Sequence, residues 1–512
     1  MERVRREPAL FQTSFYGKDI KAMKRITLII LLAALTMSAA CGSDAVPKTS
    51  DDTSAGETRT EAPDDTEPRY RIPEAVDGGG RAIRFITRTT DSQSRQSDDI
   101  TADEINGNVL NDNTYTRNEK IKEKYNVTFE IESQFDVSPV VKKSVRAGDD
   151  TYDIIIDSLN NGIVYSAEGM VNRLDEFPNT DITAPWWNNR IMGEMAMYDK
   201  YYVGINDMTI QAYFSAGIIY FNKQFAEQYC DEDPYELVRG GEWTFDKLIS
   251  LCRGVSNDLD GDGEMTEKDQ YGITYNNFAW QILYYGINEP FIKKDNSGEL
   301  YFDSGNEKII SYLQKMLPTA QDDSITLYSE NYRKLGGDYR VKTCTDAFNE
   351  NRVMFWADAM YGVMWLREMG GDFGILPTPK YDVTQKEYSS FIHSTHASSL
   401  TLPVTIPENQ RDLVGRIVED MAYESSVLVR PAFIETSLKG KYVRDNESAE
   451  TVDIVINSIT TDYTLLLNSY GLSIDSDMRK LLDKGSTDVM SLFAEKTDKW
   501  ESILEKYSEN FR

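Results

Sequence analysis

The segment Tyr152-Asp153-Ile154-Ile155-Ile156-Asp157-Ser158-Leu159-Asn160 carries the clearest structural signal in this chain. Its apolar, β-branched run predicts a strand over Tyr152–Ile156, and a helix is expected next, around Ala167–Leu174. The same rhythm precedes this segment: strands are expected at Ala82–Thr87 and Val127–Ile131, and helices at Arg117–Tyr125 and Pro139–Arg146. Alternating strands and helices indicate an α/β unit with a largely parallel sheet.

Polar residues follow two of these expected strands. Thr89-Thr90-Asp91 comes after the first strand, and Asp157-Ser158-Leu159-Asn160 comes after the third. Ligands of such sheets bind at the carboxyl ends of the strands. Asp91, Asp157 and Asn160 are therefore candidate ligand-binding residues.

A second folding unit is expected after Tyr201–Ile205, because the 512-residue chain is long enough for two or more units. A strand at Ile218–Phe221 and a helix from Asn222–Tyr229 open it. Further strands are expected near Tyr271–Tyr275, Val353–Trp356 and Phe373–Leu376, and helices fill Val452–Tyr507.

Several short segments, taken in order, resemble those of the extracellular solute-binding proteins of the carbohydrate-type family. These are the maltose-binding-protein-like receptor lipoproteins of ABC importers. The segments are Tyr152–Asp157 with Ala167–Asp175, Trp186-Trp187, Gly217–Lys223, Trp243–Leu248, Ala347-Phe348-Asn349 with Val353–Trp356, and Gly374–Lys380. Together they span about residues 82–440.

The resemblance implies an α/β, two-lobe periplasmic-binding-protein-like (type II) fold with a hinged cleft. Crossovers between the lobes are expected near Asp207–Ser215, Ser390–Leu402 and Phe433–Gly440. Lobe 1 would then comprise residues 81–208 plus 400–434, and lobe 2 residues 213–395 plus 440–512.

The N-terminal region, residues 1–40, has the pattern of a secretory signal. Met23 directly precedes the basic pair, so residues 1–22 are interpreted as an artefact of start-site choice. Lys24-Arg25 precedes the apolar run Ile26–Met37, and small residues lead to Cys41. A Cys in this position resembles a bacterial lipoprotein signal, which implies lipidation of Cys41 and anchoring on the extracellular face of the cell membrane. An ordinary secretory signal with an incidental Cys is the alternative. Residues 41–80 are acidic, lack periodic apolar residues and are expected to form a disordered tether.

The formal net charge of −29 argues against nucleic acid as a partner and against adhesion to anionic lipid through charge. The remaining cysteines, Cys230, Cys252 and Cys344, allow at most one disulfide among themselves and have no zinc-site spacing. We therefore expect a monomer that contacts the membrane through its lipid anchor alone.

A 12-residue calcium loop is predicted over residues 258–269. Ca²⁺ takes oxygen ligands from positions 1, 3, 5, 7, 9 and 12 of such a loop, with Gly at position 6 for the turn. The corresponding residues are Asp258, Asp260, Asp262, Glu264 (through its carbonyl), Thr266 and Asp269, with Gly263 at the turn. The expected role is structural, and the alternative is an acidic turn without metal.

Aromatic rings and carboxylates near strand ends suggest a carbohydrate site. Flat rings suit the C–H faces of sugars, and a pocket needs an apolar lining with few fixed polar groups. The candidates are Trp356, Asp358 and Trp280 near strand ends and Asp207 at the hinge, in addition to Asp91, Asp157 and Asn160. For each Trp, including the adjacent Trp186 and Trp187, packing in the core is the alternative.

The expected function is solute binding without catalysis: delivery of a small solute, an oligosaccharide above all, to the permease of an ABC transporter. One alternative is a secreted glycoside hydrolase, which needs a carboxylate pair at a defined separation. Another is a surface lipoprotein that binds a protein partner. His393 and His396, the two histidines of the chain, form a poor zinc site without a third ligand and are expected in the hinge.

Overall fold

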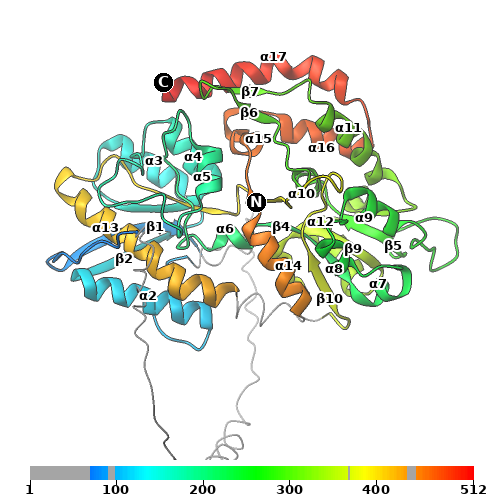
Figure 1. Cartoon of the computed structure of the whole chain (residues 1–512), viewed down its shortest axis with the longest axis horizontal. Helices are drawn as coiled ribbons and strands as arrows, with labels where there is room; N and C mark the ends of the chain where they lie inside the picture. The colour runs from blue at the N-terminus through cyan, green and yellow to red at the C-terminus, as the bar shows by residue number, and fades with distance from the viewer. Residues whose placement is uncertain (1–69, 90–98, 367–368, 435–445) are drawn as a thin grey trace, which may run out of the picture. The chain divides into compact units, whose positions relative to one another are not determined.

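A computed structural model describes residues 70–89, 99–366, 369–434 and 446–512. Cys41 and Asp91 lie outside these ranges, so their predicted roles remain predictions. The described chain contains two larger β-sheets, each covered by its own helices (Figure 1). No helix in these ranges combines the length and the apolar character that crossing a membrane requires.

The first sheet has four strands in the order β12-β3-β1-β2. Their bounds are β1 Arg81–Arg88, β2 Val127–Gln134, β3 Ile154–Ser158 and β12 Ser398–Thr401. Strands β2 and β3 run parallel to β1, and β12 runs antiparallel to β3. The largely parallel sheet predicted for this part of the chain is thus present, with one edge strand contributed from far along the sequence.

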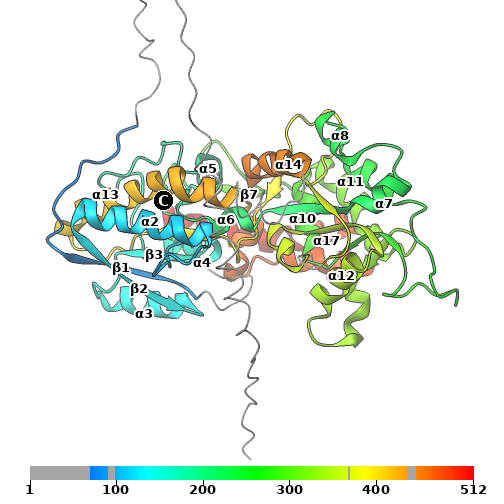
Figure 2. The same cartoon turned by 90° about the horizontal axis from the view of Figure 1, so that it is seen from below.

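Helices cover both faces of the first sheet. They are α2 Val109–Tyr125, α3 Val137–Ala147, α4 Leu159–Ala167 and α13 Glu408–Glu424. Helices α2 and α13 are in contact and lie side by side, with α3 on the opposite side of the sheet (Figure 2). The chain comes back to the first sheet at β12 and α13, so α2 and α13, which are far apart in sequence, form one helical layer.

Helix α4 lies earlier than the sequence pattern indicated. It begins directly after β3, where Ser158 Oγ accepts a hydrogen bond from the Asn161 N–H at 3.3 Å. It ends before Gly169, whose φ of +67° is a left-handed conformation that suits glycine. The helix predicted around Ala167–Leu174 is therefore wrong, because this stretch is the turn after α4.

The adjacent residues Trp186 and Trp187 are both buried beside α13. Their indole N–H groups donate to the two carboxylate oxygens of Glu419, at 2.6 Å and 3.1 Å. Burial raises the pKa of Glu419 to about 7. The Trp pair therefore has the core-packing role that the sequence left open.

The second sheet has five strands in the order β10-β4-β9-β5-β8. They are β4 Gly217–Asn222, β5 Tyr271–Tyr275, β8 Thr326–Tyr328, β9 Val353–Ala359 and β10 Phe373–Leu376. Strand β5 is parallel to β8 and β9, whereas β4 is antiparallel to β9 and β10. The strands expected from sequence in this unit are all present.

Helices also surround the second sheet. They are α7 Lys223–Tyr229, α8 Pro234–Arg239, α9 Phe245–Cys252, α10 Ala279–Tyr285, α11 Glu307–Met316, α12 Tyr339–Asn349 and α14 Asn446–Asn457. Cys230, Cys252 and Cys344 are free thiols. A large apolar core, with Trp280 and Trp356 fully buried, holds this part together.

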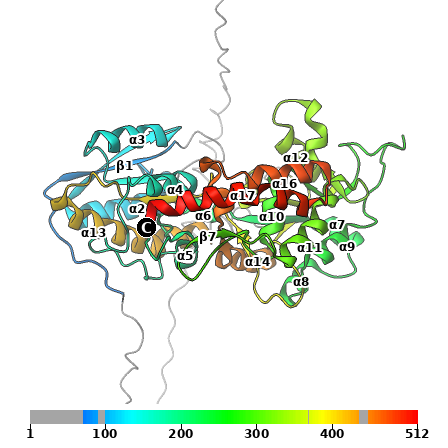
Figure 3. The same ribbon diagram turned by 90° about the horizontal axis from the view of Figure 1, so that it is seen from above.

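The C-terminal segment contacts elements that pack around the first sheet and elements that pack around the second. It comprises β13 Ile459–Thr460, α15 Tyr463–Leu466, α16 Ile474–Lys484 and α17 Val489–Ser508. Helix α15 contacts α4, while α17 contacts α16 and the hairpin strand β7 Leu300–Phe302 (Figure 3). The ring of Phe511, just beyond α17, lies 5.5 Å from that of Tyr202. This segment therefore links the two parts of the fold away from the crossovers.

Candidate ligand-binding cleft

A cavity of about 310 Å³ lies where β5 and β9 end. Because these two strands are parallel neighbours, their carboxyl ends meet at one edge of the second sheet. The polar and aromatic lining residues include Asp358, Tyr361 and Trp365 at or after the end of β9, Asn276, Phe278 and Gln281 after β5, Asp338 and Arg340 at the start of α12, and His393, Thr395 and His396 from the crossover segment.

Asp358 is the predicted site residue that the structure places directly in this lining. It lies near the end of β9 and is 8% exposed. Its Oδ1 accepts the N–H of the adjacent Ala359 at 2.7 Å, and burial raises the pKa of its carboxyl to about 7. Among the described residues its other oxygen accepts no hydrogen bond.

Aromatic side chains line the same cavity as Asp358. Tyr361 and Trp365 belong to the 3₁₀ turn η4 Met360–Trp365, and their ring centroids lie 5.5 Å apart at 86°. Two guanidinium groups lie over the ring of Phe278, that of Arg479 at 3.8 Å and that of Arg340 at 5.6 Å from the ring centroid. The cavity thus combines flat rings with a small number of fixed polar groups.

The crossover segment joins this cavity to the first sheet. Arg88 at the end of β1 donates to the carbonyl oxygens of Thr395 at 2.9 Å and His396 at 2.8 Å. Asn160, at the start of α4, donates through Nδ2 to Thr395 Oγ1 at 3.1 Å. Asn160 therefore lies beside the cavity wall, one contact away from the lining.

Asp157 makes its hydrogen bonds within the first part of the fold. It is 2% exposed. Its carboxylate accepts from the Ser158 N–H at 2.6 Å, Asn161 Nδ2 at 2.9 Å and Tyr165 Oη at 2.7 Å. Burial raises its pKa. These bonds orient the start of α4, and Asp157 does not line the cavity, so the structure does not bring it together with Asp358.

Asp207 lies at a different hollow, with Trp186 and Arg430. Its buried carboxylate accepts from Tyr213 Oη at 2.8 Å and is paired with Arg430 at 3.3 Å. Burial raises the pKa of Asp207. Its side chain is engaged in an ion pair with the half-buried Arg430 and does not line the cavity at the ends of β5 and β9.

Trp356 and Trp280 are core residues, which corrects the expectation that they present faces to a ligand. Both indoles are 0% exposed. Trp280 Nε1 donates to Asp475 Oδ1 at 2.9 Å. Trp356 shares a sheet face with Asp358, but the η4 turn covers it: a Cβ built on Gly362 would lie 3.0 Å from the indole. The rings that line the cavity are therefore those of Tyr361 and Trp365 in this turn, and not that of Trp356.

The sequence reasoning missed Tyr361, Trp365, Phe278 and Arg340. Tyr361 and Trp365 follow Asp358 closely in sequence, so extending the strand-end argument past β9 would have found them. Arg340 carries no such signal, because it lies at the start of α12 and does not follow the end of an expected strand.

The predicted calcium loop lies between α9 and β5. Asp258, Asp260 and Asp262 each place a carboxylate oxygen within 4.8 Å of the others. Gly263 has a φ of +87°, as its turn position requires. Asp269 is buried and ties the loop together, accepting from the Leu259 N–H at 2.9 Å and the Thr266 N–H at 2.7 Å. Three converging carboxylates fit a hard oxygen-preferring cation such as Ca²⁺.

Together, two α/β parts joined by returning crossovers, with a cavity at the strand ends, define the two-lobe fold of periplasmic-type substrate-binding proteins. Solved structures of such proteins superpose on the chain. The GacH receptor of Streptomyces glaucescens GLA.O, solved unliganded and with acarbose, has a TM-score of 0.52 at 11% identity, covering 83% of this chain and 99% of its own. A sugar transporter from Rhizobium etli in an open conformation gives 0.51 at 12%, covering 84% and 100%.

UgpB from Mycobacterium tuberculosis, in complex with glycerophosphocholine, has a TM-score of 0.51 at 14% identity, covering 84% of this chain and 99% of its own. No protein-family model and no curated protein matches the sequence. The two-lobe α/β fold implied by the sequence resemblance is confirmed. These superpositions establish a shared fold. The sequence identities are too low to identify the solute.

Proposed function

We propose that this protein is a solute-binding receptor that delivers a neutral carbohydrate, an oligosaccharide, to the permease of an ABC transporter. The observation that carries the proposal is the cavity at the ends of β5 and β9, with Asp358 and aromatic side chains in its lining. Such a lining binds a polar ligand by stacking and orients it by a few hydrogen bonds. Closure of the two lobes around the solute would follow the hinge movement of this class.

Carbohydrate is favoured over an anionic solute by the chemistry of the lining and by the net charge. Tyr361 and Trp365 offer flat apolar faces, and Asn276 and Asp358 offer hydrogen-bonding groups for hydroxyls. The formal net charge of −29 repels anions at long range. The acarbose complex of the similarly folded GacH receptor supports the same ligand class.

The proposal places the receptor on the extracellular face of the cell membrane, tethered through a lipid on Cys41. The support for this anchor is the signal pattern that precedes Cys41 in the sequence. An anchored receptor keeps the solute-binding lobes close to the permease. We also propose that Ca²⁺ occupies the loop of Asp258, Asp260 and Asp262 as a structural ion.

A glycoside hydrolase is the second candidate, because two carboxyl groups, Asp338 and Asp358, line the same cavity. A raised pKa, as at Asp358, is also what a general acid requires. Incubation with the bound oligosaccharide separates the two functions: a receptor returns the sugar intact, whereas a hydrolase releases new reducing ends.

The experiment that tests the receptor function is a thermal-shift screen of the purified protein against a panel of neutral oligosaccharides. A ligand at about 100 times its Kd adds roughly 2.7 kcal/mol to the free energy of unfolding. We expect at least one oligosaccharide to raise the melting temperature, with organic anions and short peptides giving no rise. A panel without any stabilising sugar would contradict the proposal.

A further inference from the structure

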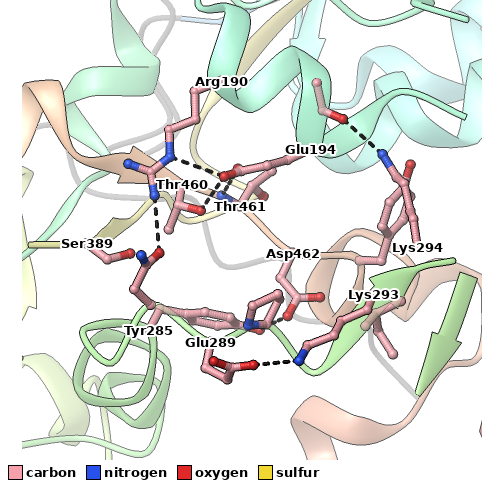
Figure 4. A pocket seen from close by; sticks show the side chains of 15 residues that line it. Arg190, Glu194, Tyr285, Glu289, Lys293, Lys294, Ser389, Thr460, Thr461 and Asp462 are labelled. Atoms are coloured by element: carbon pink, nitrogen blue, oxygen red, sulfur yellow. Dashed lines mark hydrogen bonds and ion pairs between the residues drawn. The ribbon is translucent and has the colours of Figure 1, made fainter. Parts of the chain in front are cut away.

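A second and larger cavity, of about 580 Å³, lies apart from the cleft and shares no lining residue with it. Its walls come from α5 Asn189–Met195, from the loop and strand β6 Ile292–Lys294 that follow α10, and from the segment across β13 and α15 (Figure 4). The proposed carbohydrate site does not use this cavity.

Two buried hydroxyl groups line the cavity without a hydrogen-bond partner among the described residues. They are Ser389 Oγ and Thr461 Oγ1, on side chains of residues that are 0% and 4% exposed. Figure 4 shows Ser389 on one side of the cavity and Thr461 on another, close to Glu194. Buried polar atoms in native proteins almost always have a partner, and leaving one unsatisfied is costly. The two hydroxyls are therefore free to form hydrogen bonds with a polar ligand in this space.

The charged groups of the lining are balanced in sign. Three are cationic and three anionic: Arg190, Lys293 and Lys294, and Glu194, Glu289 and Asp462. Arg190 is paired with Glu194 at 3.3 Å, and Lys293 is paired with Glu289. Glu194 also accepts from Thr460 Oγ1 at 2.8 Å and the Thr461 N–H at 2.9 Å. Most of this charge is thus neutralised within the wall, which disfavours a ligand of strong net charge.

Two groups of opposite sign are left without an ion pair in the part of the chain that the structure describes. Lys294 Nζ donates to the Gly193 carbonyl at 2.9 Å and has further donors to offer. Asp462 accepts from Tyr285 Oη at 3.0 Å, the Phe291 N–H at 3.0 Å and the Thr464 N–H at 2.7 Å. One cation and one carboxylate in a single cavity match a ligand that carries both signs.

We propose that this cavity is a second small-molecule site and that its ligand is a small zwitterion of amino-acid size. The acid group of the ligand lies against Lys294, its ammonium group faces Asp462, and Ser389 and Thr461 complete the hydrogen bonds. A zwitterion satisfies both lone charges and adds no net charge to a balanced wall. A neutral sugar would form no ion pair with Lys294, and a simple anion or cation would pair with one of the two groups alone.

The test uses calorimetric titration of the purified full chain with L-glutamine, L-serine and glycine betaine. Sodium butyrate and butylamine are the singly charged controls. The variants are Thr461→Val, which keeps the side-chain shape and removes a hydroxyl without a partner, and Lys294→Met. Lys342→Met, on the exposed face of α12, is the matched control, since the side chain of Lys342 is 73% exposed and is not part of the cavity lining.

We expect at least one zwitterion to bind the wild-type chain and the Lys342→Met variant with equal Kd. We expect Lys294→Met and Thr461→Val each to raise that Kd about tenfold, the effect of one hydrogen bond to a charged group. The proposal is overturned if none of the three zwitterions binds, or if butyrate or butylamine binds as tightly. It is also overturned if the Kd is unchanged in Thr461→Val, which keeps the fold, or if Asp358→Asn abolishes binding and so places the zwitterion in the cleft.

Discussion

The indole of Trp356 stacks on the phenol ring of Tyr220, with ring centroids 4.9 Å apart and planes inclined by 24°. The two residues are register neighbours on β9 and β4, and both are 0% exposed. The Trp356 ring, which the sequence suggested as a stacking surface for a ligand, is instead buried in the apolar core around the second sheet. Trp356 therefore stabilises the fold and does not line the cleft.

Replacing Trp356 with Ala is accordingly expected to reduce stability. Removing a buried Trp from a packed core costs about 3–5 kcal/mol, through lost transfer free energy and the cavity left behind. Denaturant unfolding of Trp356→Ala measures this loss. The control is Tyr361→Ala, whose half-buried ring lines the cavity and should cost less. Equal, small losses in both variants would contradict the core assignment of Trp356.

Stability is expected to fall as the pH rises toward neutrality. Burial raises the pKa of Asp358 from 3.8 to about 7, so the folded chain keeps a proton that the unfolded chain releases between about pH 4 and 7. The free energy of unfolding therefore decreases across this window, by up to roughly 1.4 kcal/mol per pH unit. Unfolding titrations at several pH values should show a flatter dependence for Asp358→Asn.

Glu419 provides a matched comparison for this pH dependence. Burial also raises its pKa to about 7, and its carboxylate is remote from the cleft lining. Glu419→Gln should remove a separate part of the pH dependence, and the two effects should add in the double variant because the sites share no partner. An unaltered slope in Asp358→Asn would show that this carboxyl titrates normally.

Calcium is expected to stabilise the second part of the fold. The carboxylates of Asp258, Asp260 and Asp262 converge within 4.8 Å, and bound Ca²⁺ would relieve their repulsion. Melting temperatures with excess Ca²⁺ and with EDTA should differ for the wild-type chain and converge for Asp260→Asn. Asp295→Asn, in another exposed turn, is the control and should keep the difference. Identical midpoints, with no metal found by mass analysis, would refute the site.

The lipid anchor is expected at Cys41. Its thiol follows the basic residues, apolar run and small residues of the signal pattern. In detergent partitioning of the protein produced in its native host, we expect the wild type in the detergent phase and the Cys41→Ala variant in the aqueous phase. A variant that still partitions with membranes would place the anchor elsewhere.

Much of the fold follows from local patterns, and the site follows only in part. Apolar runs predicted β9 and β10 because buried strands need them, and Asp358 was found because it ends such a strand. The start of α4 was missed, because its Ser158 cap lies inside the polar stretch Asp157–Asn160, which the sequence pattern indicates as a ligand site. Trp356 was misassigned because nothing in its sequence neighbourhood shows that η4 folds back over it. The joint contact of Trp186 and Trp187 with Glu419 depends on α13 returning to the first sheet, which is a tertiary event.

The most direct test of the account is a calorimetric titration of the wild-type chain and Trp365→Ala with the oligosaccharide that raises the melting temperature most. Trp365 lines the cleft and is only half-buried, so its removal should leave the ligand-free melting temperature nearly unchanged. The account predicts that the oligosaccharide binds the wild type, is recovered intact, and binds Trp365→Ala more weakly by about 2 kcal/mol. Equal affinity in both chains, or preference for a peptide or an anion over every sugar, would contradict a carbohydrate receptor with this cleft.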